Sequence, residues 1–118
     1  MEREFAGSAI VVRASGAVDM STVDELVLHL GAALESAVRE AAPVVAVDLE
    51  GVTYFGSAGL NAVLRCHERG MAAGIGVRLV ATNPWVVRPL EVTGLDTVLR
   101  LYRSLPEALG PDDAAAQS

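Results

Sequence analysis

The fold is decided by residues 44–60, whose sequence is VVAVDLEGVTYFGSAGL. The first part, 44–49, is short, apolar and rich in valine, which is typical of a central strand covered on both faces. Residues 51–56 begin and end with glycine and are predicted to form a loop. Ser57 is then placed to cap a helix, because a serine hydroxyl accepts a hydrogen bond from a free backbone N–H at a helix start. Ser57 is therefore expected beyond the carboxyl end of a strand, where α/β sheets carry their functional sites.

Strand and helix patterns alternate on both sides of this stretch. Strands are predicted around Phe5 and at 9–14, 77–81 and 98–102, a turn at 15–16, and helices at 23–41, from Ser57 to the glycines of 70–76, at 85–92 and after Ser104. Ser21, with Asp24 three residues on, is expected to cap the first helix, and Asn83 with Pro84 the third. This order predicts an α/β fold, with a mixed, mostly parallel sheet of about four to five strands and about four helices packed on it.

The composition bounds the number of domains and excludes several kinds of site. A chain of 118 residues has the size of one domain. We expect that domain to cover 1–110, followed by a disordered tail at 111–118. The chain has nine arginines and no lysine, which excludes a Walker P-loop, a Schiff-base enzyme and a receiver domain. A net charge of −6 argues against nucleic-acid binding.

The cysteine content and the apolar runs indicate a compartment. Cys66 is the single cysteine, so no internal disulfide is possible, which fits a reducing cytoplasm. Its surroundings predict a small, inert hydrophobic residue. No uncharged apolar run reaches about 18 residues, so no membrane insertion is expected. The sequence therefore predicts a cytoplasmic protein.

Neither the serine nor the histidines predict an enzyme. Ser57 lies in the segment GSAG at 56–59, but the nucleophile elbow of hydrolases needs a glycine where this chain has Phe55. His29 and His67 each fall within a predicted helix and have no obvious acidic residue to orient them. No metal-ligand spacing occurs either. No catalytic residue, metal or cofactor is therefore predicted.

Two roles are open for Ser57. In the first it is a helix cap and nothing more, which contributes about 1 kcal/mol. In the second it is a switch, because Gly56 and Gly59 flank it and Ala58 is small, so that a partner is able to approach the backbone closely. A phosphate at Ser57 would carry about −1.5 to −2 charges and would face free N–H groups at the helix start. The fold would tolerate that charge, whereas a packed interface over it would not.

Three segments share their patterns with one known family. Residues 16–19, GAVD, are similar to its Gly-x-hydrophobic-Asp turn after the second strand. Residues 47–60 are similar to its central strand, loop and Asp-Ser-(Ser/Thr/Ala)-Gly-Leu motif, and 89–95 to its Φ-x-x-(Thr/Ser)-Gly-Leu segment. In order and spacing, over residues 5–109, the chain resembles the STAS domain family, and within it the bacterial anti-sigma factor antagonists.

The resemblance implies a small bacterial regulator of transcription that binds an anti-sigma factor, often a serine kinase, and so frees a sigma factor. It implies that the kinase phosphorylates Ser57, that phosphorylation breaks the complex, and that a phosphatase restores binding. The implied partner surface comprises Asp19, Ser21, Gly56, Ser57, Ala58, Gly59, Leu60 and Asn61. The family usually has an aspartate, which helps to position the motif for the kinase, where this chain has Gly56. The alternative is a STAS module of a transport assembly, or a small-ligand sensor, without phosphorylation.

Overall fold

The computed structural model describes residues 1–110, and the tail predicted at 111–118 lies outside this range. The strands are β1 (Glu2–Ala6), β2 (Ala9–Val18), β3 (Val44–Phe55), β4 (Gly76–Val80) and β5 (Arg100–Tyr102). The helices are α1 (Val23–Arg39), α2 (Ser57–Ala73), α3 (Pro84–Thr93) and α4 (Leu105–Ala108), with a 3-10 turn, η1, at Leu95–Thr97. The strands form one sheet in the order β1-β2-β3-β4-β5.

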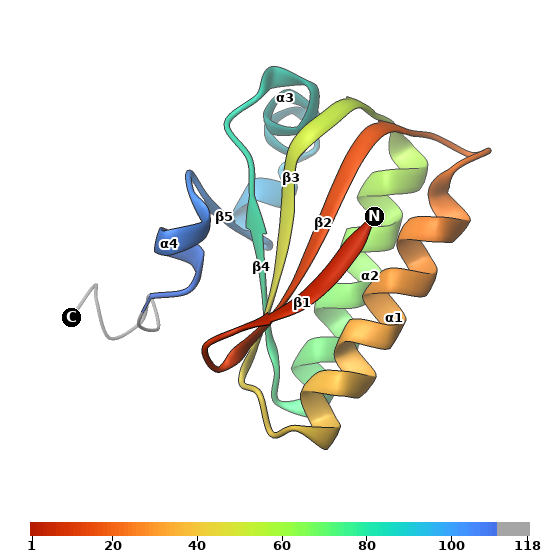
Figure 1. Ribbon diagram of the computed structural model, residues 1–118. Coiled ribbons are helices and arrows are strands. Elements are labelled where there is room, and N and C mark those ends of the chain that lie inside the picture. The colour runs from red at the N-terminus through yellow and green to blue at the C-terminus, as the bar shows by residue number, and fades with distance from the viewer. Residues whose placement is uncertain (111–118) are drawn as a thin grey trace.

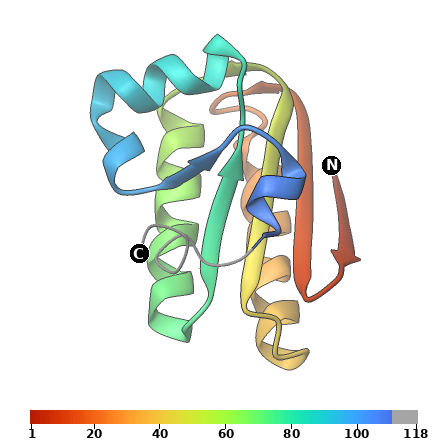
Figure 2. The same ribbon diagram turned by 90° about the vertical axis from the view of Figure 1, so that its left-hand side faces the viewer.

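The sheet is mixed and mostly parallel. β1 pairs antiparallel with β2, and the other neighbouring strands run parallel. Figure 1 shows α1 and α2 side by side on one face of the sheet and α4 on the other. Figure 2 looks onto the second face and shows α4 in front of the sheet. The predicted α/β fold is confirmed, with a five-stranded sheet in the described part of the chain.

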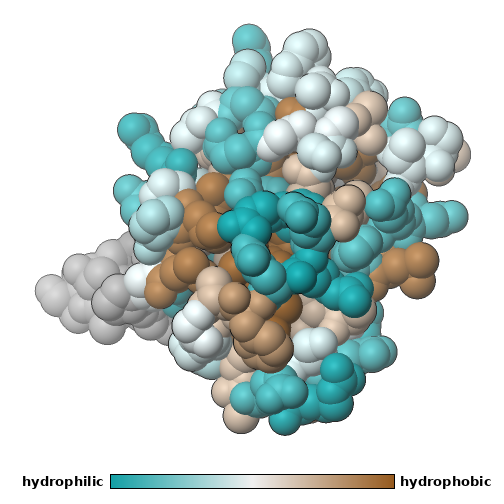
Figure 3. Space-filling model, in the orientation of Figure 1, coloured by the Kyte–Doolittle hydropathy of each residue, from teal (hydrophilic) through white to brown (hydrophobic). Residues whose placement is uncertain are grey.

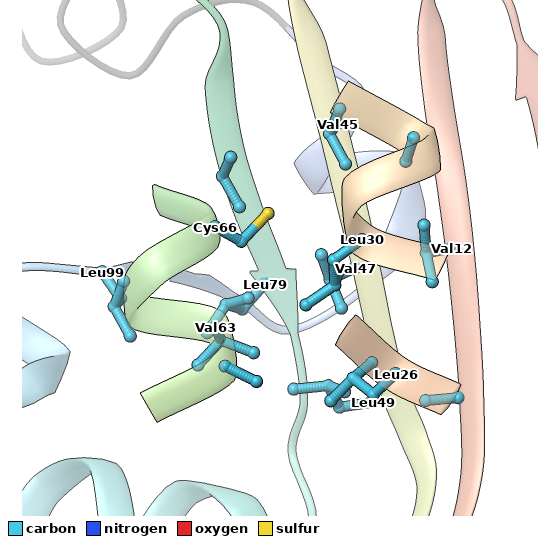
Figure 4. Close-up of a cluster of buried hydrophobic side chains, with 14 of the residues drawn as sticks. Val12, Leu26, Leu30, Val45, Val47, Leu49, Val63, Cys66, Leu79 and Leu99 are labelled. Carbon is cyan, nitrogen blue, oxygen red and sulfur yellow. The ribbon is translucent and has the colours of Figure 1, made fainter. Parts of the chain in front are cut away.

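The main core lies between the sheet and the pair of helices α1 and α2. Figure 4 shows its side chains: Leu26 and Leu30 from α1, Val63 and Cys66 from α2, and Val12, Val45, Val47, Leu49 and Leu79 from the strands. Along β3, Val45 and Val47 belong to this core, whereas Ala46 packs in a second buried cluster that includes Ala108 of α4. β3 is thus buried on both faces, as its apolar run predicts.

β2 and β3 are longer than the sequence predicts. The turn expected at 15–16 and most of the loop expected at 51–56 are wrong, because these segments pair in parallel up to Val18 and Phe55. Gly16 has a φ of +78° and lies beside a shift in the register of the pairing. It therefore forms an irregularity within a strand and does not end it. The backbone N–H and C=O groups of the two segments pair with each other in the sheet. The glycines of each segment, considered alone, predict turns.

The elements after β4 follow the predicted caps. Asn83 caps α3, with its Oδ1 accepting from the backbone N of Val86 at 3.1 Å. Ser104 caps α4, with its Oγ accepting from the backbone N of Glu107 at 3.3 Å. The strand predicted at 98–102 is confirmed over its last three residues, β5, because η1 precedes it.

A buried arginine holds α4 on the second face of the sheet. Arg78 of β4 is buried, and its Nη1 donates to the carbonyl oxygens of Ala108 at 2.7 Å and Gly110 at 2.9 Å. Its guanidinium carbon also lies 5.6 Å from the centre of the Tyr102 ring. The charge is therefore buried against carbonyl dipoles and an aromatic face, both of which favour a cation.

β1 forms one edge of the sheet and carries charged residues. Glu2, Arg3 and Glu4 are exposed, and Figure 3 shows hydrophilic side chains gathered over this strand. Glu4 forms a salt bridge with Arg13 of the neighbouring strand. Charge on an edge strand disfavours pairing with another chain, so this edge is protected.

Candidate functional site

The link between β3 and α2 is a single residue, Gly56. Its backbone is extended, with φ −91° and ψ −170°, and its carbonyl accepts the first helical hydrogen bond, from the N of Leu60 at 3.1 Å. Gly56 is therefore the N-cap of α2, and the prediction that Ser57 caps this helix is wrong. The N of Gly56 also donates to the carbonyl of Val18 at 3.2 Å, which ties the start of α2 to the end of β2.

The Ser57 side chain is exposed at the first position of α2. Within residues 1–110 its hydroxyl makes no hydrogen bond. β3 lies between β2 and β4, so Ser57 does lie beyond the carboxyl end of a central parallel strand, as predicted. Its hydroxyl is therefore available to another molecule and is not committed to holding the fold.

The turn between β2 and α1 is organised by Asp19. One oxygen of its carboxylate accepts from the backbone N of Ser21 at 2.9 Å, from the Ser21 hydroxyl at 2.7 Å and from the backbone N of Thr22 at 3.2 Å. These hydrogen bonds, above all that from the Ser21 hydroxyl, lower the pKa of Asp19, so its exposed carboxylate is ionised at neutral pH. The prediction that Ser21 caps α1 is wrong: the N-cap is Thr22, and the Ser21 hydroxyl binds Asp19 instead.

The two connections lie at the same end of the molecule (Figure 1), and together they line one shallow hollow. It has a volume of about 430 Å³ and is lined by Asp19, Met20, Ser21, Tyr54, Gly56, Ser57 and Ala58. We call it the Ser57 hollow. Five of the residues predicted for the partner surface therefore line one hollow, although two of them precede α1 and three lie at the start of α2.

The remaining residues predicted for that surface do not line the hollow. Gly59 and Leu60 are buried, and Asn61 is exposed on the next turn of α2. A Cβ at Gly59 would lie 2.7 Å from Cε1 of Phe55 and 3.0 Å from Cγ1 of Val18. Gly59 thus allows the first turn of α2 to pack directly on the ends of two strands. Gly59 therefore supports the Ser57 hollow from the core side.

The hollow includes two residues, Met20 and Tyr54, that the sequence did not predict for the partner surface. Met20 is 87% exposed and Tyr54 49%, so both present large side chains beside Ser57. Phe55, which follows Tyr54 in the sequence, is buried instead. Alternation along β3 separates the two, and that signal was hidden because the segment was assigned to a loop. Met20 carries no pattern beyond its place in the turn.

Other reactive side chains lie away from the hollow. Cys66 is buried under α2, and burial raises the pKa of its thiol to about 11, which agrees with an inert cysteine. His67 is partly buried, and within residues 1–110 its Nδ1 has no hydrogen-bond partner. In the same range, no three His, Cys, Asp or Glu side chains gather to hold a metal ion. Nor is any helix there long and apolar enough to cross a membrane.

Ser57→Ala is expected to change the free energy of unfolding by less than about 0.5 kcal/mol, because an exposed hydroxyl without a partner is lost. Asn83→Ala is the matched comparison: it removes the N-cap of α3 and should cost about 0.5–2 kcal/mol. Urea titration of both variants measures the difference. A loss for Ser57→Ala as large as that for Asn83→Ala would mean that the Ser57 hydroxyl holds the fold.

Comparison with known proteins identifies one family. The family model described as "Mlab, STAS domain" matches residues 1–102. A curated relative, the anti-sigma-F factor antagonist RsfB of Mycobacterium tuberculosis, is 33% identical over 100 residues, which cover 80% of this chain and 80% of RsfB.

Solved structures agree with that match. The crystal structure of an anti-sigma factor antagonist from Mycobacterium paratuberculosis has a TM-score of 0.78 and 34% identity, and the likeness covers 99% of this chain and 92% of that one. SpoIIAA of Bacillus, in its unphosphorylated form, has a TM-score of 0.73 over 99% of this chain and 96% of its own, and its 19% identity shows the fold alone. With the family model covering nearly all of the described residues, the chain belongs to the STAS domain family.

Proposed function

We propose that this protein is a bacterial anti-sigma factor antagonist. It binds an anti-sigma factor over the Ser57 hollow and thereby frees a sigma factor, acting in the cytoplasm by binding and not by catalysis. The observation that supports this proposal most directly is that residues of two separate connections line one exposed hollow: Asp19, Ser21, Gly56, Ser57 and Ala58. The relatives named as anti-sigma factor antagonists support the same role.

The proposal includes a switch at Ser57. The anti-sigma factor is of the serine kinase type and phosphorylates Ser57, and a phosphatase removes the phosphate. The support is the position of Ser57: its hydroxyl is exposed, and the free N–H groups at the start of α2 would face a phosphate. Solved structures hold SpoIIAA in an unphosphorylated and a phosphorylated form. Because its identity to this chain is only 19%, the argument rests on the geometry of Ser57.

The glycine at position 56 bears on the kinase reaction. The family's usual aspartate would stand at the N-cap of α2, directly before the acceptor serine. Without it, the motif lacks the carboxylate that directly precedes the serine in the family and helps to position the motif for the kinase. We therefore expect slow phosphorylation of Ser57, while the hollow itself stays available for binding.

The test is reconstitution with purified proteins. Each kinase-type anti-sigma factor of the source organism, held in complex with its sigma factor, is mixed with this protein and resolved by gel filtration. Release of one sigma factor is expected, and after incubation with ATP mass spectrometry should find the phosphate on Ser57. If no sigma factor is released from any complex, the protein is not an antagonist. If release occurs and the phosphate is found on another residue, the switch at Ser57 is wrong and the antagonist role stands.

A further inference from the structure

Two large apolar side chains flank Ser57 in the same hollow. Met20 approaches from the turn before α1 and Tyr54 from the end of β3, and both remain exposed. Exposed apolar side chains are common singly on protein surfaces, but a pair beside a free hydroxyl and a carboxylate forms a small contact site. Met71 is a useful contrast, because it is 68% exposed on the last turns of α2 and does not line this hollow.

The Tyr54 ring lies at the start of α2, in space that is open because Gly56 has no side chain. A Cβ there would lie 3.0 Å from Oη, 3.1 Å from Cε2 and 3.3 Å from Cζ of Tyr54. These distances are shorter than ordinary contacts, so any side chain at position 56 would require the Tyr54 ring to shift by a few tenths of an ångström. Gly56 and Tyr54 therefore act together: the glycine makes the space, and the aromatic ring fills it beside Ser57.

The charge of the hollow indicates what kind of surface covers these side chains. Asp19 accepts its hydrogen bonds from Ser21 and Thr22 and, within residues 1–110, forms no salt bridge. Among the described residues no cationic side chain lines the hollow, and the chain as a whole carries a net charge of −6. The matching partner surface presents an apolar side chain beside an arginine or a lysine.

We infer that Met20 and Tyr54 are the apolar contacts by which this protein selects its anti-sigma factor, and that Gly56 serves to keep the Tyr54 ring in the contact. The inference rests on the proposed function and adds the residues that determine specificity. It also gives a physical reason for the glycine at a position where the family usually has aspartate: the space is occupied by Tyr54.

The test is a set of binding titrations against the anti-sigma factor whose sigma factor is released in the reconstitution. Tyr54→Ala is expected to weaken binding about 30-fold or more, as for an aromatic residue at the centre of an interface, and Met20→Ala about 5-fold or more. Tyr54→Phe keeps the ring and should bind within about 2-fold of the wild type. Met71→Ala removes an equally apolar, exposed side chain outside the hollow and should leave the affinity unchanged.

A separate pair of variants tests the coupling between Gly56 and Tyr54. Gly56→Ser adds a Cβ and introduces a residue favoured at the N-cap, so the helix start is preserved while the ring has to move. It should weaken binding at least about 5-fold in the wild type, but by less than about 2-fold in the Tyr54→Ala background, where no ring remains to displace. Circular dichroism of each variant confirms that it is folded.

The outcomes separate this inference from the proposed function. If Ser57→Asp abolishes binding while Tyr54→Ala and Met20→Ala bind as Met71→Ala does, the antagonist role stands and the inference is overturned. Equal effects of Gly56→Ser in both backgrounds would overturn the coupling. A wild-type protein that binds none of the purified anti-sigma factors would overturn the proposed function, and the inference with it.

Discussion

Phe55→Ala is expected to lower the free energy of unfolding by about 3–5 kcal/mol, the range for removing a buried aromatic side chain. Phe55 is the last residue of β3 and is 3% exposed. Its ring fills the space beneath the first turn of α2, where Gly59 comes close enough that a Cβ would lie 2.7 Å from Cε1 of the ring. Without the ring, a cavity opens directly below Ser57. Urea titration measures the loss.

Phe5→Ala is the matched control, because it makes the same chemical change at an exposed site. Phe5 lies on the edge strand β1 and is 57% exposed, so its loss should stay within about 0.5 kcal/mol. Similar losses for the two variants would contradict the account of Phe55 as the support of the site. Phe55→Leu, which keeps part of the volume, should fall between them.

The sequence predicted the elements whose signal is local. The apolar run at 44–49 predicted a strand buried on both faces, and β3 is such a strand because its alternate residues enter two different cores. Asn83 and Pro84 predicted the start of α3, since a capping side chain and a proline at the first helical position act within one turn. Helical spacing of apolar residues likewise predicted α1 and α2.

The errors fall where distant segments decide the local structure. Glycines at 51–56 and 15–16 indicate turns when each segment is considered alone, but the two segments pair and extend β2 and β3. The same pairing makes Gly56 the N-cap of α2, because its N–H is held by Val18 at the end of β2. No local pattern distinguishes a serine at the N-cap from a serine at the first helical position. The sequence therefore predicts the cap at Ser57, one residue after the observed N-cap, Gly56.

The position of the candidate site could be predicted from the sequence, but the full set of residues that line it could not. The carboxyl end of a central strand located Ser57, and the resemblance added Asp19, which the structure brings into the same hollow. The hollow's outline depends on which face of α2 is buried. Gly59 and Leu60 face the core, whereas Met20, from a turn far away in sequence, lies beside Ser57.

Ser57→Asp is expected to reduce binding of the anti-sigma factor by two orders of magnitude or more while leaving the fold intact. A carboxylate at the first position of α2 faces the positive end of the helix dipole, so the free energy of unfolding should hardly change. In the complex the cation expected on the partner is already paired with Asp19, so the added carboxylate would be buried beside a like charge without a partner of its own, which costs several kcal/mol. About 1.4 kcal/mol corresponds to a tenfold change in affinity, so the loss exceeds a hundredfold.

The direct measurement is calorimetric titration of wild-type protein, Ser57→Ala and Ser57→Asp against the purified anti-sigma factor, with urea titration of each variant alongside. The account predicts that Ser57→Ala binds about as the wild type does, and that Ser57→Asp is equally stable but binds at least about a hundredfold more weakly. If folded Ser57→Asp binds as tightly as the wild type, no packed interface covers Ser57. The surface that recognises the anti-sigma factor then lies elsewhere on the domain.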